Sequence, residues 1–277
     1  MEQSKERLEI LQRIKQYERE GHFNIDVEND PPTVHLKPGE VDYLRQKLSS
    51  KIKTHFVNKK ARKFINDLIK EKQLVIEDII GYENFDSLQG GFVITCNHFN
   101  QLDNFAIYKC FESRLKNKIL YKVIREGNYH AFTGALGLFF KHCNTLPLSS
   151  NLKEMERFLH ATDTLLQRGE KILVYPEQAM WWNYKKPRPL QSGAFKIAVR
   201  ADCPILPCFI TMRDGEGFDQ HGFPVQKYTI HILSPIFPNK ELSNKENINE
   251  MKEKNYNAWK EVYENVYNTP LVYEEEE

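Results

Sequence analysis

From Leu74 onward, short runs of β-branched and apolar residues alternate with segments of helical periodicity. The clearest run, residues 91–97 (GFVITCN), is apolar through its middle, which is typical of a strand buried on both faces. Strands separated by helices are joined by crossovers and lie parallel. The sequence therefore predicts an α/β fold with a central, mostly parallel sheet flanked by helices.

The remaining elements of this core follow from the same pattern. Strands are expected at 118–124, 171–176, 204–210 and 228–236, and a strand or hairpin at 74–85. Helices are expected at 103–116, 151–168, 193–200 and 244–267. We assign residues 74–277 to this single α/β domain.

Residues 1–73 differ in pattern and are predicted to be an N-terminal helical extension. Apolar residues at helical spacing indicate a short amphipathic helix over 4–19. Between 41 and 73 an apolar stripe runs among many Lys and Arg residues, with a break expected near 57–59 that would divide it into two helices. Such a surface suits peripheral contact with an anionic membrane. The alternative is a solvated helix that packs on the core.

Composition and charge limit which partners and which cellular compartment are expected. The formal net charge of +1 and the absence of a recognition motif argue against a nucleic-acid partner. Five cysteines without a disulfide or zinc spacing are expected to be reduced thiols. The charged N-terminus lacks the apolar region of a signal peptide, and the apolar stretch 131–140 is about half the ~20 residues that a spanning helix needs. We expect a cytoplasmic protein, peripheral on the inner face of the membrane.

The segment CNHFNQLD, residues 96–103, carries the sharpest chemical signal. It follows a buried strand, so Asn97 and His98 should emerge at the carboxyl end of the sheet, where open α/β sheets place their sites. Asp103 lies five residues after His98, across a strand-to-helix turn. A carboxylate there can accept the imidazole N–H and orient the histidine as a general base toward a hydroxyl. Alone, the spacing is short and common, and a capping Asp beside an unrelated surface His would also produce it.

Further segments follow this one in a telling order. They are VYPEQAMW (174–181) and PLQSGAFKIAVRADCPILPCFI (189–210). Together with NHFNQLD (97–103), they resemble the glycerolipid acyltransferase family, the lysophosphatidic acid acyltransferase-like group. That family has Asn-His-x4-Asp after a buried strand, a strand ending in Phe-Pro-Glu-Gly-Thr-Arg, and a strand with a late proline. The resemblance covers roughly residues 76–237.

The resemblance implies an O-acyltransferase. The donor would be an acyl-CoA or acyl carrier protein thioester, and the acceptor a hydroxyl of a lyso-lipid, glycolipid or related alcohol. No bound cofactor and no metal would be needed, and the histidines form no metal-binding pattern such as His-Glu-x-x-His. Two alternatives remain open: an inactive or repurposed relative that binds lipid or acyl thioester, and a hydrolase that uses the same base.

The same resemblance assigns roles to residues. His98 would deprotonate the acceptor hydroxyl and Asp103 would orient it. Glu177 would shape the acceptor site, Pro176 would set its backbone, and Gly193 would allow close approach of the backbone. The other residues assigned to substrate binding are Asn97, Gln178, Lys185 and Arg188.

Departures from the family pattern bear on the acceptor. The family's Gly-Thr-Arg is Gln178, Ala179 and Met180 here, and a second expected Arg falls in the Leu-Ser-Ser of 148–150. In the family these arginines bind phosphate, and guanidinium–phosphate contacts are strong. Either Lys185, Lys186 and Arg188 supply the charge from a shifted loop, or the acceptor lacks a phosphomonoester. We favour the second interpretation.

Two further features have open interpretations. The aromatic residues of 181–184 form either an apolar or sugar-stacking wall at the site or a cluster that fills the core. Lys122 and Arg125, at the end of a strand, either contact an anion or are ordinary surface charges.

Overall fold

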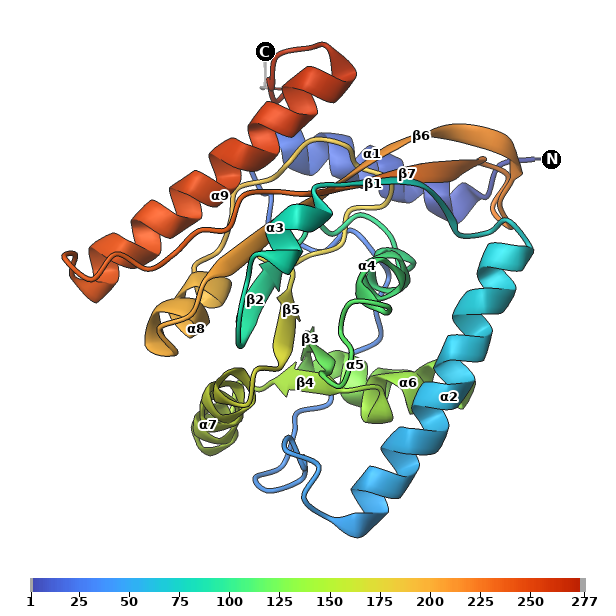
Figure 1. The fold of residues 1–277 in the computed structure, drawn as a ribbon. Helices are drawn as coiled ribbons and strands as arrows, with labels where there is room; N and C mark the ends of the chain where they lie inside the picture. The colour runs from blue at the N-terminus through green and yellow to red at the C-terminus, as the bar shows by residue number, and fades with distance from the viewer. Residues whose placement is uncertain (1, 275–277) are drawn as a thin grey trace.

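The computed structural model describes residues 2–274 and contains a mixed seven-stranded sheet in the order β1-β7-β6-β2-β5-β3-β4 (Figure 1). Its strands are β1 (Val75–Ile80), β2 (Phe92–Thr95), β3 (Leu120–Arg125), β4 (Thr145–Leu148), β5 (Lys171–Val174), β6 (Ile205–Phe218) and β7 (Pro224–Ile232). Neighbouring strands are parallel except for β6 and β7. The predicted α/β fold with a mostly parallel sheet is confirmed.

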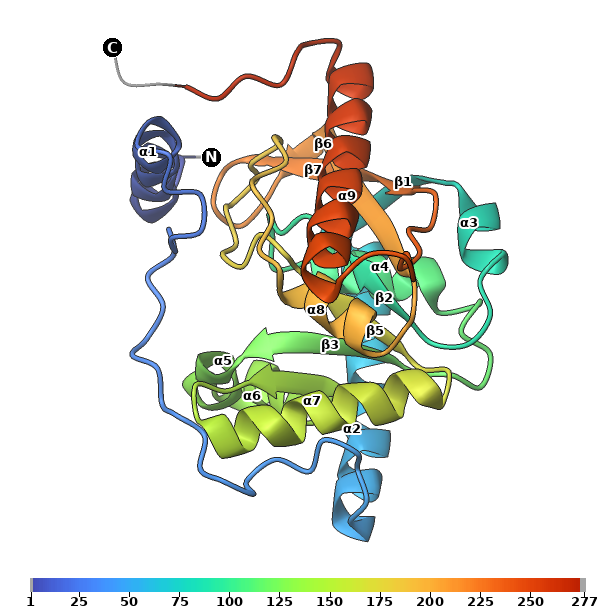
Figure 2. The same cartoon turned by 90° about the vertical axis from the view of Figure 1, so that its left-hand side faces the viewer.

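Helices cover both faces of this sheet, with α7, α8 and α9 on one side and α2, α3 and α4 on the other (Figures 1 and 2). The helices are α1 (Lys5–Arg19), α2 (Leu48–Lys70), α3 (Tyr82–Asp86), α4 (Asp103–Phe111), α5 (Glu126–Ala131), α6 (Gly134–His142), α7 (Leu152–Gln167), α8 (Gly193–Arg200) and α9 (Asn244–Tyr267). Side chains cap two of them. Asn151 accepts from the first turn of α7, and Ser243 forms a capping box with Glu246 on α9.

Several boundaries differ from the sequence prediction. The helix expected to break near 57–59 is continuous as α2. Residues 74–85 form a strand and a short helix rather than a hairpin, because Gly81 turns the chain with a φ of +89° and lies against the Ile232 carbonyl. The short strand β4 and the helices α5 and α6 were not anticipated. β4 has only four residues, one of them Pro147, so it shows no readable alternation.

The two N-terminal helices, α1 and α2, pack on different parts of the core. Ile10 and Ile14 of α1 are buried against Trp181 and Trp182. The second half of α2 buries Ile65 and Leu68 in the cluster beneath α4. The first half of α2 instead extends along the edge of the molecule (Figure 1), with Leu48, Ile52 and Phe56 exposed. None of the helices in residues 2–274 is long and apolar enough to cross a bilayer.

Candidate active site

His98 and Asp103 meet at the carboxyl end of β2, where the chain turns into α4. The imidazole Nδ1–H donates to Oδ2 of Asp103 at 2.7 Å. The same oxygen accepts from the backbone N–H groups of Phe99 and Asn100, at 3.1 and 3.2 Å. Asp103 is fully buried, whereas 19% of the His98 side chain is exposed. The pair is therefore held rigidly from inside, and Nε2 is the ring nitrogen left free for a proton acceptor role.

The surroundings of this pair come from three other strands. Tyr175, directly after β5, stacks on the imidazole with ring centroids 4.2 Å apart and planes at 23°. Burial is the main cause that raises the pKa of the Tyr228 phenol on β7, and the nearby charge of Asp103 raises it further. Lys122 of β3 lies over the rings of Phe105 and Phe140 on the α4 and α6 side, and burial lowers the pKa of its ammonium group. The sequence prediction did not include the two tyrosines.

Glu177 and Arg188 form a buried ion pair that supports His98 from behind. Oε2 of Glu177 accepts from the His98 backbone N–H at 2.9 Å and from the Arg188 guanidinium at 2.9 Å. Arg188 also donates to the carbonyls of His98, Ala179 and Phe23. Both side chains are almost fully buried, with 1% and 2% exposure. The guanidinium expected to bind substrate is thus turned into the protein, where it fixes the loop that carries the histidine.

The other residues assigned to substrate binding occupy varied positions. The amide of Asn97 is buried and pairs with both backbone groups of Ile210, which ties the end of β2 to β6. Pro176 is buried and its carbonyl accepts from Gln191. Gln178 is exposed and has a φ of +68°. This left-handed conformation is the one that glycine adopts without strain, which explains the family's glycine at this position.

Gly193 and Lys185 lie at the surface. A Cβ built on Gly193 would meet no atom within 4 Å, so no part of the described chain approaches this backbone closely. The Lys185 ammonium lies 5.5 Å from the ring centre of Tyr267 on α9. Their roles toward a substrate stay predictions.

The aromatic segment after Glu177 packs into the interior. Trp181 is fully buried and Trp182 is 5% exposed, in one cluster with α1. The indole N–H of Trp181 donates to the Ile25 carbonyl, and Arg188 lies over its ring. Of the two interpretations left open by the sequence, the structure favours a core cluster for the tryptophans.

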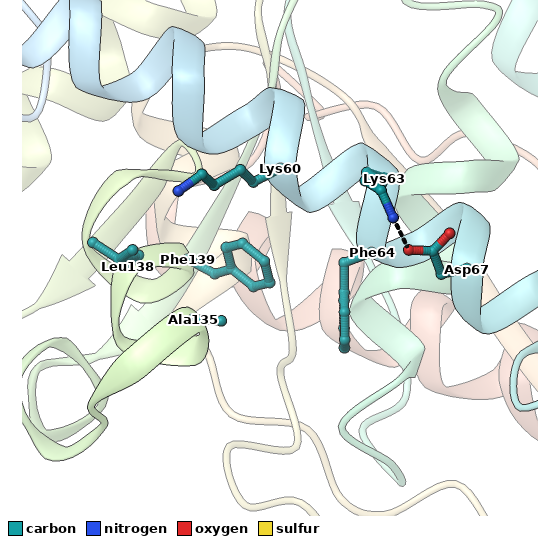
Figure 3. A pocket seen from close by; sticks show the side chains of 7 residues that line it. All are labelled: Lys60, Lys63, Phe64, Asp67, Ala135, Leu138 and Phe139. Carbon is teal, nitrogen blue, oxygen red and sulfur yellow. Dashed lines mark hydrogen bonds and ion pairs between the residues drawn. The ribbon is translucent and has the colours of Figure 1, made fainter.

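A cavity of about 410 Å³ lies between α2 and α6 (Figure 3). Its lining residues are Lys60, Lys63, Phe64, Asp67, Ala135, Leu138 and Phe139. None of them belongs to the His98–Asp103 pair, so the cavity does not open onto the histidine. Within residues 2–274, no group of three or more His, Cys, Asp or Glu side chains is arranged to hold a metal ion.

Comparison with known proteins agrees with this geometry. A family model described as Acyltransferase matches residues 77–211, which contain His98, Asp103 and Glu177. Among solved structures, the chain is similar to the crystal structure of the 1-acyl-sn-glycerophosphate (LPA) acyltransferase PlsC from Thermotoga maritima. The TM-score is 0.54 at 17% identity, over 83% of this chain and 87% of that one. No curated protein matches the sequence.

These observations define the class of the protein. The family match over residues 77–211 and the PlsC-like fold agree with the resemblance drawn from the motifs, which is confirmed. These findings support an acyltransferase with the fold of PlsC.

Proposed function

We propose that the protein transfers a fatty acyl group from an acyl-CoA or acyl carrier protein thioester to an acceptor hydroxyl, with His98 as general base. The observation that carries this proposal is the 2.7 Å hydrogen bond from the partly exposed imidazole to the buried Asp103 carboxylate. Nε2 takes the hydroxyl proton while the oxygen attacks the thioester carbonyl. The tetrahedral intermediate then expels the thiolate, which takes the proton back from the imidazolium.

The acceptor in this proposal lacks a phosphomonoester. Of the three cations that would replace the missing arginines, two are paired elsewhere, and the third, Lys185, lies at the surface near Tyr267. Arg188 is buried on Glu177, and Lys186 is paired with Glu18 of α1. Arg125 is paired with Asp26 and Asp30, which the N-terminal segment brings to the end of β3. A dianionic phosphate would have to displace these carboxylates, so a neutral or zwitterionic alcohol, such as a glycolipid or a lyso-lipid without a terminal phosphate, fits better.

A peripheral membrane contact through 41–73 is the second part of the proposal. Leu48, Ile52 and Phe56 of α2 are 73%, 49% and 61% exposed. They follow each other at intervals of four residues and so share one helix face. Neighbouring lysines of the same helix are Lys51, Lys53, Lys59 and Lys60. Each contributes about 1 kcal/mol of attraction near an anionic surface, which places the protein on the cytoplasmic leaflet in this proposal.

Thiol release from long-chain acyl-CoA and acyl carrier protein tests the reaction. Wild type, His98→Ala and the control His160→Ala, an exposed histidine on α7, are assayed with a panel of alcohols, lyso-lipids and glycerol 3-phosphate. We expect thiol release that depends on an acceptor, is lost in His98→Ala and is retained in His160→Ala. Release of free fatty acid without an acceptor would indicate a hydrolase. Absence of any His98-dependent release would favour the inactive or repurposed relative, and efficient use of glycerol 3-phosphate or lysophosphatidic acid would contradict the proposed acceptor class.

Liposome co-sedimentation tests the membrane contact. Deleting residues 1–73 would strip apolar cover from the core, because Ile10, Ile14, Ile65 and Leu68 are buried there. A triple Leu48→Ser, Ile52→Ser, Phe56→Ser variant changes only exposed side chains and is the better perturbation. Its matched control is Leu152→Ser on α7, which is 81% exposed. We expect the triple variant alone to lose binding to anionic vesicles; retained binding would place the docking surface elsewhere.

A further inference from the structure

Tyr175 has no role in the mechanism described so far, yet its ring lies against the catalytic histidine. The two ring centroids are 4.2 Å apart and the planes are nearly parallel, at 23°. The residue directly follows β5, so its backbone is fixed by the sheet on one side and by Pro176 on the other. The resembled family has Phe at this position, and the hydroxyl is therefore a feature of this chain.

The tyrosine hydroxyl and the second carboxylate oxygen of Asp103 both lack partners. Within residues 2–274, neither the Tyr175 hydroxyl nor Oδ1 of Asp103 has a hydrogen bond, and both atoms are buried. All three donors to Asp103 reach Oδ2 instead. Unpaired buried polar atoms are costly, and in native proteins nearly all of them find a partner.

The ionisation of the phenol fits such a pairing. Burial is the largest cause that raises the pKa of Tyr175 well above its ordinary value, and the neighbouring negative charge of Asp103 raises it further. The phenol therefore stays protonated at neutral pH. It can donate a hydrogen bond to a carboxylate, and such bonds to a charged group are stronger than neutral ones.

We propose that Tyr175 is a positioning residue for the His98–Asp103 pair: its hydroxyl donates to Oδ1 of Asp103 while its ring packs against the imidazole. This inference rests on the proposed general-base role of His98. The carboxylate would then be held at both oxygens and the imidazole held in its plane. Tyr175 itself touches neither acceptor nor thioester in this role.

Other titratable groups face the same pair and must be separated from Tyr175. They are Tyr228 from β7, Lys122 from β3, Cys96 at the end of β2 and Glu177 after β5. Tyr228 packs edge-on against Phe99, with ring centroids 5.3 Å apart, rather than on the imidazole. Of the two tyrosines near Asp103, only Tyr175 also stacks on the imidazole.

Removing the Tyr175 hydroxyl should shift the pH dependence of the reaction rate in one direction. When the hydroxyl is removed, the Asp103 carboxylate loses one donor and presents more of its charge to the imidazolium. Positive charge on His98 is then better stabilised, and the histidine keeps its proton to a higher pH. The acid limb of the pH–rate profile should therefore move to higher pH.

Tyr175→Phe tests this proposal because it keeps the ring and removes only the hydroxyl. We expect kcat to fall about tenfold, the scale of a hydrogen bond to a charged group, with little change in KM. The matched control is Tyr43→Phe, which removes a buried hydroxyl that donates to the Pro147 carbonyl, away from the histidine. A thermal melt of each variant verifies that the fold is retained.

A second readout does not depend on catalysis. The imidazole nitrogens of ¹⁵N-histidine-labelled protein are titrated by NMR, with the His98 signals assigned from a His98→Gln sample. We expect Tyr175→Phe to raise the titration midpoint of His98 and Tyr43→Phe to leave it unchanged. An unchanged midpoint together with an unchanged pH–rate profile in Tyr175→Phe would overturn the proposal. If wild type transfers no acyl group, the proposed function fails, and the NMR titration still decides whether Tyr175 acts on the pair.

Discussion

Replacing Arg188 with Met removes the guanidinium that links four groups around the active-site loop. Its nitrogens donate to Glu177 and to the carbonyls of Phe23, His98 and Ala179. The His98 carbonyl keeps a second donor, the backbone N–H of Trp181 at 3.1 Å. The Phe23 and Ala179 carbonyls lose this donor, and the Glu177 carboxylate is left buried without its cation.

The expected cost is large because the pair is almost completely enclosed, with 1% and 2% exposure of the two side chains. Removing one partner of a buried ion pair costs about 3–5 kcal/mol. A domain has roughly 5–15 kcal/mol of total stability, so Arg188→Met should lose a substantial part of it. Urea denaturation at neutral pH, followed by tryptophan fluorescence, measures this loss.

Two comparisons sharpen the measurement. Glu177→Gln combined with Arg188→Met removes both charges, and we expect the double variant to recover about 1–3 kcal/mol relative to the sum of the single changes. Arg200→Met, whose ion pair with Asp163 is half-exposed, should cost less than about 1 kcal/mol. If Arg188→Met unfolds within about 0.5 kcal/mol of wild type and instead raises KM, the buried-pair reasoning is wrong and the substrate-binding role first assigned to Arg188 is restored.

Three further predictions concern single positions. Gly193→Ala should keep full activity and stabilise α8 by about 0.5–1 kcal/mol, because the new methyl group meets no atom within 4 Å; a loss of acyl transfer would show that substrate passes close to this backbone. Gln178→Gly should stabilise by up to ~1 kcal/mol, because Gln178 has a φ of +68°; a lower melting temperature would contradict this. The third position is Glu126. Burial raises the pKa of this carboxyl, but hydrogen bonds from His35, the Leu36 N–H and Ser150 outweigh burial and lower the pKa from 4.5 to about 2. The ionised carboxylate therefore contributes to stability above about pH 4.5, and this contribution is lost as the pH falls toward 2. Glu126→Gln should be less stable than wild type at pH 7 and approach wild type as the pH is lowered to 3. A difference in melting temperature that stays constant with pH would refute this prediction.

The local features of the active site could be read from the sequence. Asn97, His98 and Asp103 follow a strand whose apolar residues indicate that it is buried. A five-residue separation across a strand-to-helix turn brings the His98 and Asp103 side chains together. The alternation of strands and helices likewise predicted the parallel core. These inferences needed only contacts between residues close in the chain, and periodicity and turn chemistry encode such contacts directly.

Long-range packing decided what the sequence left open. Arg188 binds Glu177 and the Phe23 carbonyl, and the latter lies 165 residues away in the sequence. The acidic residues that pair with Arg125 also come from the N-terminal segment, and α1 covers Trp181 and Trp182. A sequence pattern gives the charge of an arginine or the face of a tryptophan, but not which distant segment will cover it.

The same distinction explains Tyr175. Its sequence position, next to Pro176 and Glu177, gives no sign that the ring lies against His98. Only the pairing of β2 with β5 brings the end of one strand beside the end of the other, and so places the phenol ring on the imidazole. The sequence by itself determined the fold class and which residues form the proposed reactive pair, because both arise from local pattern. The tertiary structure decided which charges are free and what holds the pair in place, because burial and partnership depend on segments that meet only in the folded chain.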